Sequence, residues 1–152
     1  MTQFVLASDH AGLQLRAELA DHLKGRGVAF EDLGPNSPAS VDYPDFAARV
    51  AETVGRGQVP FGLLVCGTGI GMCITANKVA GVRAALCSTE FEARMARAHN
   101  DANVLCLGQR TVGAGVARAI LDAFLDTPFE GGRHAGRVEK IRQVELAWQK
   151  GR

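Results

Sequence analysis

The sequence lacks the features that define several large classes of protein. No stretch approaches the roughly 20 consecutive apolar residues of a membrane-spanning helix, and the first residues carry neither a basic segment nor a long apolar run. Lys and Arg number 17 against 16 Asp and Glu, so the net charge of +1 provides no basic excess for nucleic acid or anionic lipid. We therefore expect a cytoplasmic protein that binds neither nucleic acid nor membrane.

Paired cysteines are also absent, and the spacing of the four cysteines excludes the common cysteine-based sites. The four cysteines form no CxxC pair, and no histidine clusters with them in the sequence. We expect reduced thiols, no structural zinc and no other metal. The four positions are Cys66, Cys73, Cys87 and Cys106.

Short apolar runs alternate with longer helical patterns along the whole chain. The length of 152 residues favours one domain spanning 1–152. The runs predicted to be strands are 4–8, 28–34, 61–66, 82–87 and 102–108. The segments predicted to be helices are 13–27, 45–57, 72–81, 89–100, 113–126 and one that begins near residue 131. This alternation predicts an α/β fold with a parallel sheet and helices on both faces, where ligands bind beyond the carboxyl ends of the strands.

The most unusual stretch is "LLVCGTGIGMC", residues 63–73, in which Gly67, Gly69 and Gly71 alternate. It follows a predicted strand and opens a predicted helix, a context in which several backbone N–H groups can bind an anion. It is not a Walker loop, because Met72 stands where Lys-Ser/Thr would begin, and its GxGxG spacing differs from the dinucleotide GxGxxG. The structural alternative is a tight strand–helix crossing that only requires small residues.

Cys66 at the edge of this loop has two interpretations. A cysteine that closes a buried strand is most often a small hydrophobe. At the carboxyl end of a strand and facing a helix N-terminus, however, the pKa of a thiol is lowered, so that the thiolate can form near neutral pH. Cys73, Cys87 and Cys106 lack that setting, so we expect them in the core. A thiolate beside backbone donors suits removal of a proton next to a carbonyl, with N–H groups stabilising the enediolate oxygen.

Two further motifs carry polar side chains near predicted strand ends. "SDHAG" places Asp9 and His10 just after the first strand, although Asp is also an ordinary helix N-cap. "AHNDAN" places His99 and Asn100 between a helix and the fifth strand, where a capping or turn role is the alternative.

"GRHAGR" places Arg133 and Arg137 on one face at the start of the last helix. Positive charges there oppose the helix dipole unless an anion lies between them, so the motif indicates a phosphate site. Arg110, just after the fifth strand, could add a third cation.

In combination, the motifs resemble the ribose-5-phosphate isomerase B family, in the wider group that includes galactose-6-phosphate isomerase subunits. The resemblance extends from about Phe4 to Leu146 and rests on "SDHAG", "DYPDFA", "CGTGIGMCITANKVAGVRAALC", "ARAHNDANVLCLG" and "GGRHAGRV". It implies a three-layer α/β/α Rossmann-like sandwich around a five-stranded parallel sheet. It also implies interconversion of ribose 5-phosphate and ribulose 5-phosphate without metal or organic cofactor. The partners it implies are copies of the same chain, in homodimers or homotetramers with shared active sites.

The resemblance also assigns roles to individual residues. Cys66 would move a proton between C1 and C2 of the sugar, Thr68 would assist at the substrate oxygens, and His99 would open the furanose ring. His134 would be either a phosphate contact or a helix cap. The residues that would bind substrate, some from the neighbouring subunit, are Asp9, His10, Tyr43, Gly67, Gly69, Ile70, Gly71, Asn100, Arg110, Arg133 and Arg137.

Several alternatives stay open at this point. The same chemistry could act on allose 6-phosphate, galactose 6-phosphate or a tetrose phosphate. A nucleotide-binding or regulatory module could use the glycine loop only to hold a phosphate, and a catalytically silent scaffold subunit is a third possibility.

The last predicted helix carries more apolar side chains than a terminal surface helix needs, so we expect it to pack on a partner subunit. These side chains are Val138, Ile141, Val144, Leu146 and Trp148.

Overall fold

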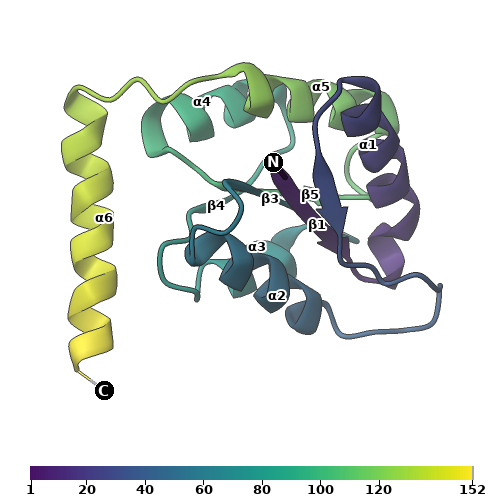
Figure 1. The fold of residues 1–152 in the computed structure, drawn as a ribbon, viewed down its shortest axis with the longest axis horizontal. Helices are drawn as coiled ribbons and strands as arrows, with labels where there is room; N and C mark the ends of the chain where they lie inside the picture. The colour runs from purple at the N-terminus through teal and green to yellow at the C-terminus, as the bar shows by residue number, and fades with distance from the viewer. Residues whose placement is uncertain (152) are drawn as a thin grey trace.

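The computed structural model describes residues 1–151, and a five-stranded parallel sheet forms its middle layer (Figure 1). The strands are β1 (Phe4–Ser8), β2 (Phe30–Asp32), β3 (Phe61–Cys66), β4 (Ala84–Leu86) and β5 (Val104–Gly108). They lie in the order β2-β1-β3-β5-β4, which confirms the predicted parallel sheet. β2 and β4 are shorter than predicted because each is an edge strand that pairs over only three residues.

Helices cover both faces of the sheet (Figure 1). One core joins alternate residues of the central strands to α1, α4 and α5, and a second core joins the other residues to α2 and α3. Burial on both faces explains why the central strands are continuously apolar. The predicted three-layer α/β/α sandwich is therefore confirmed. The helices are α1 (Leu13–Gly25), α2 (Tyr43–Gly55), α3 (Ile70–Ala76), α4 (Glu90–Asn100), α5 (Ala114–Asp126) and α6 (Arg133–Lys150), with a short 3-10 turn, η1 (His10–Gly12), before α1.

The third helix differs from its predicted range of 72–81, because it begins at Ile70 and ends at Ala76. Gly69, with φ +78°, starts the helix two residues early. After the helix, the Asn77 amide pairs with Ala84, donating to its carbonyl oxygen at 2.9 Å and accepting from its N–H at 2.8 Å. These bonds turn the chain toward β4 in place of a further helical turn.

α6 stands beside the sheet edge rather than on either face (Figure 1). Near its middle, the Glu145 carboxylate accepts a hydrogen bond from the N–H of Gly81, at 3.0 and 3.1 Å to its two oxygens. Its apolar side chains are largely uncovered, with Trp148 74% and Val144 61% exposed. Among residues 1–151, no helix is both long and apolar enough to span a membrane.

The buried Arg16 side chain joins three segments at the carboxyl edge of the sheet, the edge at which the strands end. Its guanidinium donates to Ser8 Oγ at 2.8 Å and to the Pro35 carbonyl at 2.6 Å, and its Nε lies 3.2 Å from Asp32 Oδ1. Removing this cation takes the guanidinium donor from Ser8 Oγ and from the Pro35 carbonyl, and the counter-ion from Asp32. We expect Arg16→Met to lower the free energy of unfolding by about 3 kcal/mol.

The measurement is urea unfolding at 25 °C. The matched control is Arg56→Met, which breaks only the exposed pair with Glu52 and should cost less than about 0.5 kcal/mol. Equal losses in the two variants would show that Arg16 does not join these segments.

Candidate active site

The glycine loop between β3 and α3 holds the Cys66 thiol. The Gly69 N–H donates to Cys66 Sγ at 3.1 Å, and the side chain of Cys66 is only 5% exposed. The next N–H, of Ile70, donates to the Thr68 hydroxyl at 3.3 Å. The predicted strand–loop–helix geometry is therefore present, with a backbone donor directed at the sulfur.

The three glycines of this loop serve different purposes. A Cβ on Gly69 would lie 2.6 Å from Leu86 Cδ1, so this position is small for packing reasons. A Cβ on Gly71 would lie 2.5 Å from the Tyr43 ring, and one on Gly67 would lie 3.2 Å from Arg110 Nη1. Gly67 and Gly71 thus let two polar side chains close against the loop. Close packing therefore favours a small residue at all three positions, as the structural alternative predicts, and anion binding by the loop stays a prediction.

Two neighbouring segments complete this part of the carboxyl edge. Asp9 is 7% exposed and its Oδ1 accepts from the N–H groups of Ala11 and Gly12, at 2.9 and 3.1 Å, which bears out the capping alternative. His10 beside it is exposed, and its Nδ1 accepts from Val41 N–H at 3.2 Å.

After β5, the chain folds back over the glycine loop. Gln109 N–H donates to the Cys66 carbonyl and Arg110 N–H donates to the Gly67 carbonyl, both at 2.9 Å. One chain therefore brings together nine predicted site positions around Cys66. These positions are Asp9, His10, Tyr43, Gly67, Thr68, Gly69, Ile70, Gly71 and Arg110.

The remaining predicted residues lie at the opposite, amino edge of the sheet. His99 and Asn100 end α4, shortly before β5 begins at Val104. Val104 pairs with Gly62, four residues before Cys66, so the start of β5 lies about 13 Å along the sheet from the thiol. Within one chain, His99 and Asn100 do not reach Cys66.

At this amino edge, His99 meets the start of α6. The His99 and His134 rings stack with centroids 4.1 Å apart and planes at 8°. The carboxylate of Glu130 lies beside both rings, with Oε2 at 3.4 Å from His134 Nε2 and 4.0 Å from His99 Nε2. Arg133 Nε donates to His134 Nε2 at 3.5 Å, and Arg137 follows one turn later on α6.

Of the two roles expected for His134, the helix cap is wrong, because its side chain stacks on His99 and does not cap α6. A phosphate contact by His134 stays a prediction. Burial is the main cause that lowers the pKa of His134, and the nearby charge of His99 lowers it further. Glu130 is a further member of this cluster that was not among the predicted site residues. The sequence feature that could have indicated it is the spacing of four residues between Glu130 and His134, with Gly131 and Gly132 between them, both of which have positive φ.

Three metal-ligand side chains meet in this cluster, with donor atoms of His99, Glu130 and His134 all within 4.8 Å of one another. The two rings are nearly parallel, however, so their nitrogen lone pairs run side by side and do not converge on one point. That geometry does not fit a tetrahedral metal site.

The other cysteines follow the sequence prediction with one exception. Cys87 and Cys106 are buried in the core as expected, whereas Cys73 is half-buried. A hydrogen bond from the Cys106 thiol is the main cause that lowers the pKa of Cys73 to about 7, against the opposing effect of burial. Cys73 Sγ also donates to the Ala84 carbonyl at 3.5 Å, toward the amino edge.

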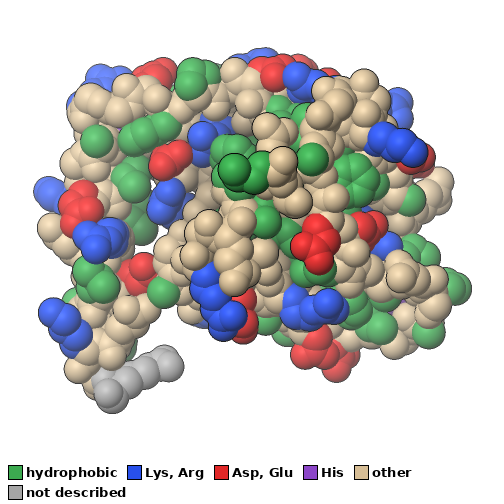
Figure 2. All heavy atoms as spheres, in the orientation of Figure 1, with side chains coloured by type: hydrophobic (Ala, Val, Ile, Leu, Met, Phe, Trp, Pro, Cys, Tyr) green, Lys and Arg blue, Asp and Glu red, His purple; other side chains and the backbone are tan. Residues whose placement is uncertain are grey.

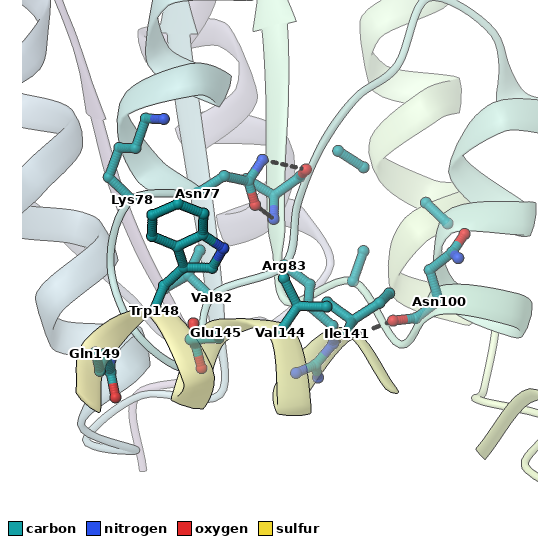
Figure 3. Close-up of a pocket in the computed structure, with 14 residues that line it drawn as sticks. Asn77, Lys78, Val82, Arg83, Asn100, Ile141, Val144, Glu145, Trp148 and Gln149 are labelled. Atoms are coloured by element: carbon teal, nitrogen blue, oxygen red, sulfur yellow. Dashed lines mark hydrogen bonds between the residues drawn. The ribbon is translucent and has the colours of Figure 1, made fainter. Parts of the chain in front are cut away.

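A cavity of about 820 Å³ separates α6 from the body of the protein, as Figure 2 shows in the space-filling view. In Figure 3, Ile141, Val144 and Trp148 of α6 face Asn77 and Arg83 across this cavity. Positive and negative side chains are interspersed over the face in Figure 2, as the small net charge predicts. Of the predicted site residues, Asn100 lines the cavity.

The fold and the carboxyl edge define an α/β enzyme whose thiol and backbone donors suit proton transfer beside a carbonyl. The sequence model of the family described as Ribose/Galactose Isomerase matches residues 4–141. The chain belongs to this family, and it is an aldose–ketose isomerase of the sugar-phosphate isomerase type.

Relatives from several organisms cover nearly the whole chain. The ribose-5-phosphate isomerase B of Escherichia coli K12 is 46% identical over 145 residues, 95% of this chain and 97% of the relative. The solved Clostridium thermocellum ribose-5-phosphate isomerase B has a TM-score of 0.95 and 49% identity, covering 97% and 99% of the two chains. The Mycoplasma genitalium ribose-5-phosphate isomerase B, solved with bound ribulose-5-phosphate, has a TM-score of 0.92 and 47% identity, covering 95% and 97%.

Proposed function

We propose that this chain interconverts ribose 5-phosphate and ribulose 5-phosphate through an enediolate, with Cys66 as the base. The observation that carries the proposal is the Cys66 thiol at the end of β3, 3.1 Å from the N–H of Gly69. An N–H donor at this distance stabilises a thiolate, the form that accepts a proton from carbon. The relatives named for ribose 5-phosphate support the substrate.

The carbon chemistry would take place beside the glycine loop. Cys66 removes the proton from C2 of the open-chain aldose and returns it to C1, and the reverse reaction uses the same steps. The oxygens at C1 and C2 become negatively charged on the way, and the N–H groups of Gly71 and Met72 in the first turn of α3 have no acceptor within the helix. These groups and the exposed Thr68 hydroxyl supply the donors for the developing charge.

The residues for ring opening and part of the phosphate site would come from a second copy of the chain. In one chain, His99 and Asn100 lie at the edge of the sheet opposite to Cys66, and Arg133 and Arg137 begin α6 beside them. The exposed apolar side chains of α6 and the cavity beneath it support docking of another subunit there. A homodimer, alone or paired into a homotetramer, would then place His99 of one subunit over Cys66 of the other.

In such a shared site the sugar phosphate would lie between the two subunits. His10 and Arg110 would bind the phosphate from the Cys66 side, and Arg133 and Arg137 would bind it from the partner. Tyr43, closed against Gly71, would line the pocket. Cations on both sides of a dianion give it more partners than either subunit alone could offer.

The test of substrate is isomerase activity of the purified, chelator-treated protein on four sugar phosphates. We expect ribose 5-phosphate to be converted fastest, ahead of allose 6-phosphate, galactose 6-phosphate and erythrose 4-phosphate. A preference for one of the other three would contradict the proposed substrate while keeping the chemistry. Absence of turnover on all four would contradict the proposed function itself.

A further inference from the structure

The stacked pair of His99 and His134 fixes the orientation of the more exposed ring. The His134 side chain is 6% exposed and belongs to α6, whereas about 35% of the His99 side chain is exposed at the end of α4. With centroids 4.1 Å apart and planes at 8°, the His134 ring covers one face of His99. A ring packed flat on a buried neighbour cannot rotate freely, so His99 presents one fixed edge to the solvent.

The segment before α6 is built to hold Glu130 beside this pair. Glu130 N–H donates to the Ala98 carbonyl at 3.0 Å, which joins the segment to α4. Gly131 and Gly132 follow with φ of +64° and +52°, a conformation that favours glycine. The turn they make allows Glu130 and His134 to approach His99 together.

The surroundings of the pair disfavour protonation of His134. Burial is the main cause that lowers the pKa of His134, and the charges of His99, Arg133 and Arg137 act in the same direction, with only Glu130 opposing them. A second positive charge on a ring stacked directly on His99 would be repelled, which favours His134 as a flat, uncharged support for its neighbour.

We propose that His134 and Glu130 are positioning residues that hold the His99 ring in the orientation needed to open a furanose ring. The proposal rests on the proposed function, in which His99 acts on ribose 5-phosphate. In that step the bond between C1 and the ring oxygen breaks, and its electron pair stays on the ring oxygen, which takes the proton from His99. The C1 hydroxyl gives its proton to solvent water and becomes the carbonyl, and His99 regains a proton from solvent.

The two directions of the reaction separate this role from a general effect on the enzyme. Ribulose 5-phosphate is acyclic, because the hydroxyl that would close a furanose ring carries the phosphate. Exchange of its C1 proton with D2O, followed by NMR, therefore requires Cys66 chemistry but no ring opening. We expect His134→Ala and Glu130→Gln each to slow turnover of ribose 5-phosphate about 10- to 100-fold. Exchange at C1 of ribulose 5-phosphate should stay within about twofold of wild type.

Two further variants make the test specific. His134→Phe keeps a flat ring against His99 and should retain turnover within about fivefold of wild type. Glu52→Gln makes the same chemical change as Glu130→Gln at an exposed pair on α2 and should leave both reactions unchanged. Because Glu130 is more than half exposed, its variant tests the proposal even if His134→Ala fails to fold.

Equal loss of both reactions in Glu130→Gln, or no loss of either, would overturn the positioning role. Turnover in His134→Phe as poor as in His134→Ala would overturn the role of stacking. A wild-type protein that neither converts ribose 5-phosphate nor exchanges the C1 proton would instead refute the proposed function.

Discussion

Replacing Cys66 by alanine is expected to lower kcat for ribose 5-phosphate by about three orders of magnitude, the usual contribution of a catalytic base. The sulfur receives the Gly69 N–H at 3.1 Å, and the neighbouring Thr68 hydroxyl is too weak a base to replace it. Binding should persist, because the proposed phosphate ligands are other side chains. The measurements are steady-state turnover and calorimetric binding of ribose 5-phosphate to the variant.

Cys73→Ser is the matched control, because Cys73 is the rival thiol. Its pKa of about 7 makes Cys73 a readily ionised cysteine, yet its sulfur is directed at the Ala84 carbonyl. Ala84 begins β4, so Cys73 faces the amino edge, away from the glycine loop. We expect this variant to keep most of its turnover. Loss of activity in Cys73→Ser with activity retained in Cys66→Ala would reverse the assignment.

Mixing two inactive variants is expected to restore activity if each site uses two subunits. Cys66→Ala damages the carboxyl-edge half of the site and His99→Asn damages the amino-edge half. After dissociation and random reassociation in equal amounts, half of the dimers are hybrids with one intact site out of two. About a quarter of wild-type activity should therefore return, from a nearly inactive starting level.

The control for this experiment combines Cys66→Ala with Thr68→Ala. Both residues lie in the same half of the site, so hybrids in which His99 comes from the partner contain no intact site. This mixture should regain nothing. No recovery in the first mixture, or a monomer by light scattering at micromolar concentration, would contradict the shared site.

The sheet could be predicted from the sequence because its cause is local. The central strands are buried on both faces, so each leaves an uninterrupted apolar run such as "FGLLVC". The edge strands β2 and β4 are shorter than predicted. Each has a neighbour on one side only, so each ends where its hydrogen bonds to that neighbour end. α3 also ends earlier than predicted. The Asn77 hydrogen bonds to Ala84 of β4 end the helix, and contacts between residues so far apart leave no trace in the periodicity of the sequence.

The candidate site was predictable in its residue types but not in its arrangement. Glycine spacing and the position of Cys66 at a strand end are local properties, and the structure bears out the loop geometry. The separation of His99 from Cys66 follows from the direction of the strands and could have been deduced from the sequence. A helix that leads into a parallel strand ends at the amino edge of the sheet, whereas Cys66 ends its strand at the carboxyl edge. The stacking of His99 on His134 could not be deduced from the sequence, because it depends on where α6 lies relative to α4 in the folded chain.

The most direct test of a cysteine-based proton transfer is the fate of hydrogen at C2 when ribulose 5-phosphate is converted to ribose 5-phosphate in D2O. We expect deuterium at C2 of the product, because the proton held on the Cys66 thiol can exchange with solvent before it is delivered to C2. Mass spectrometry of the isolated aldose measures this, and the Cys66→Ala variant should form almost no labelled product. Labelled product formed by Cys66→Ala at the wild-type rate would contradict an enediolate with Cys66 as its base.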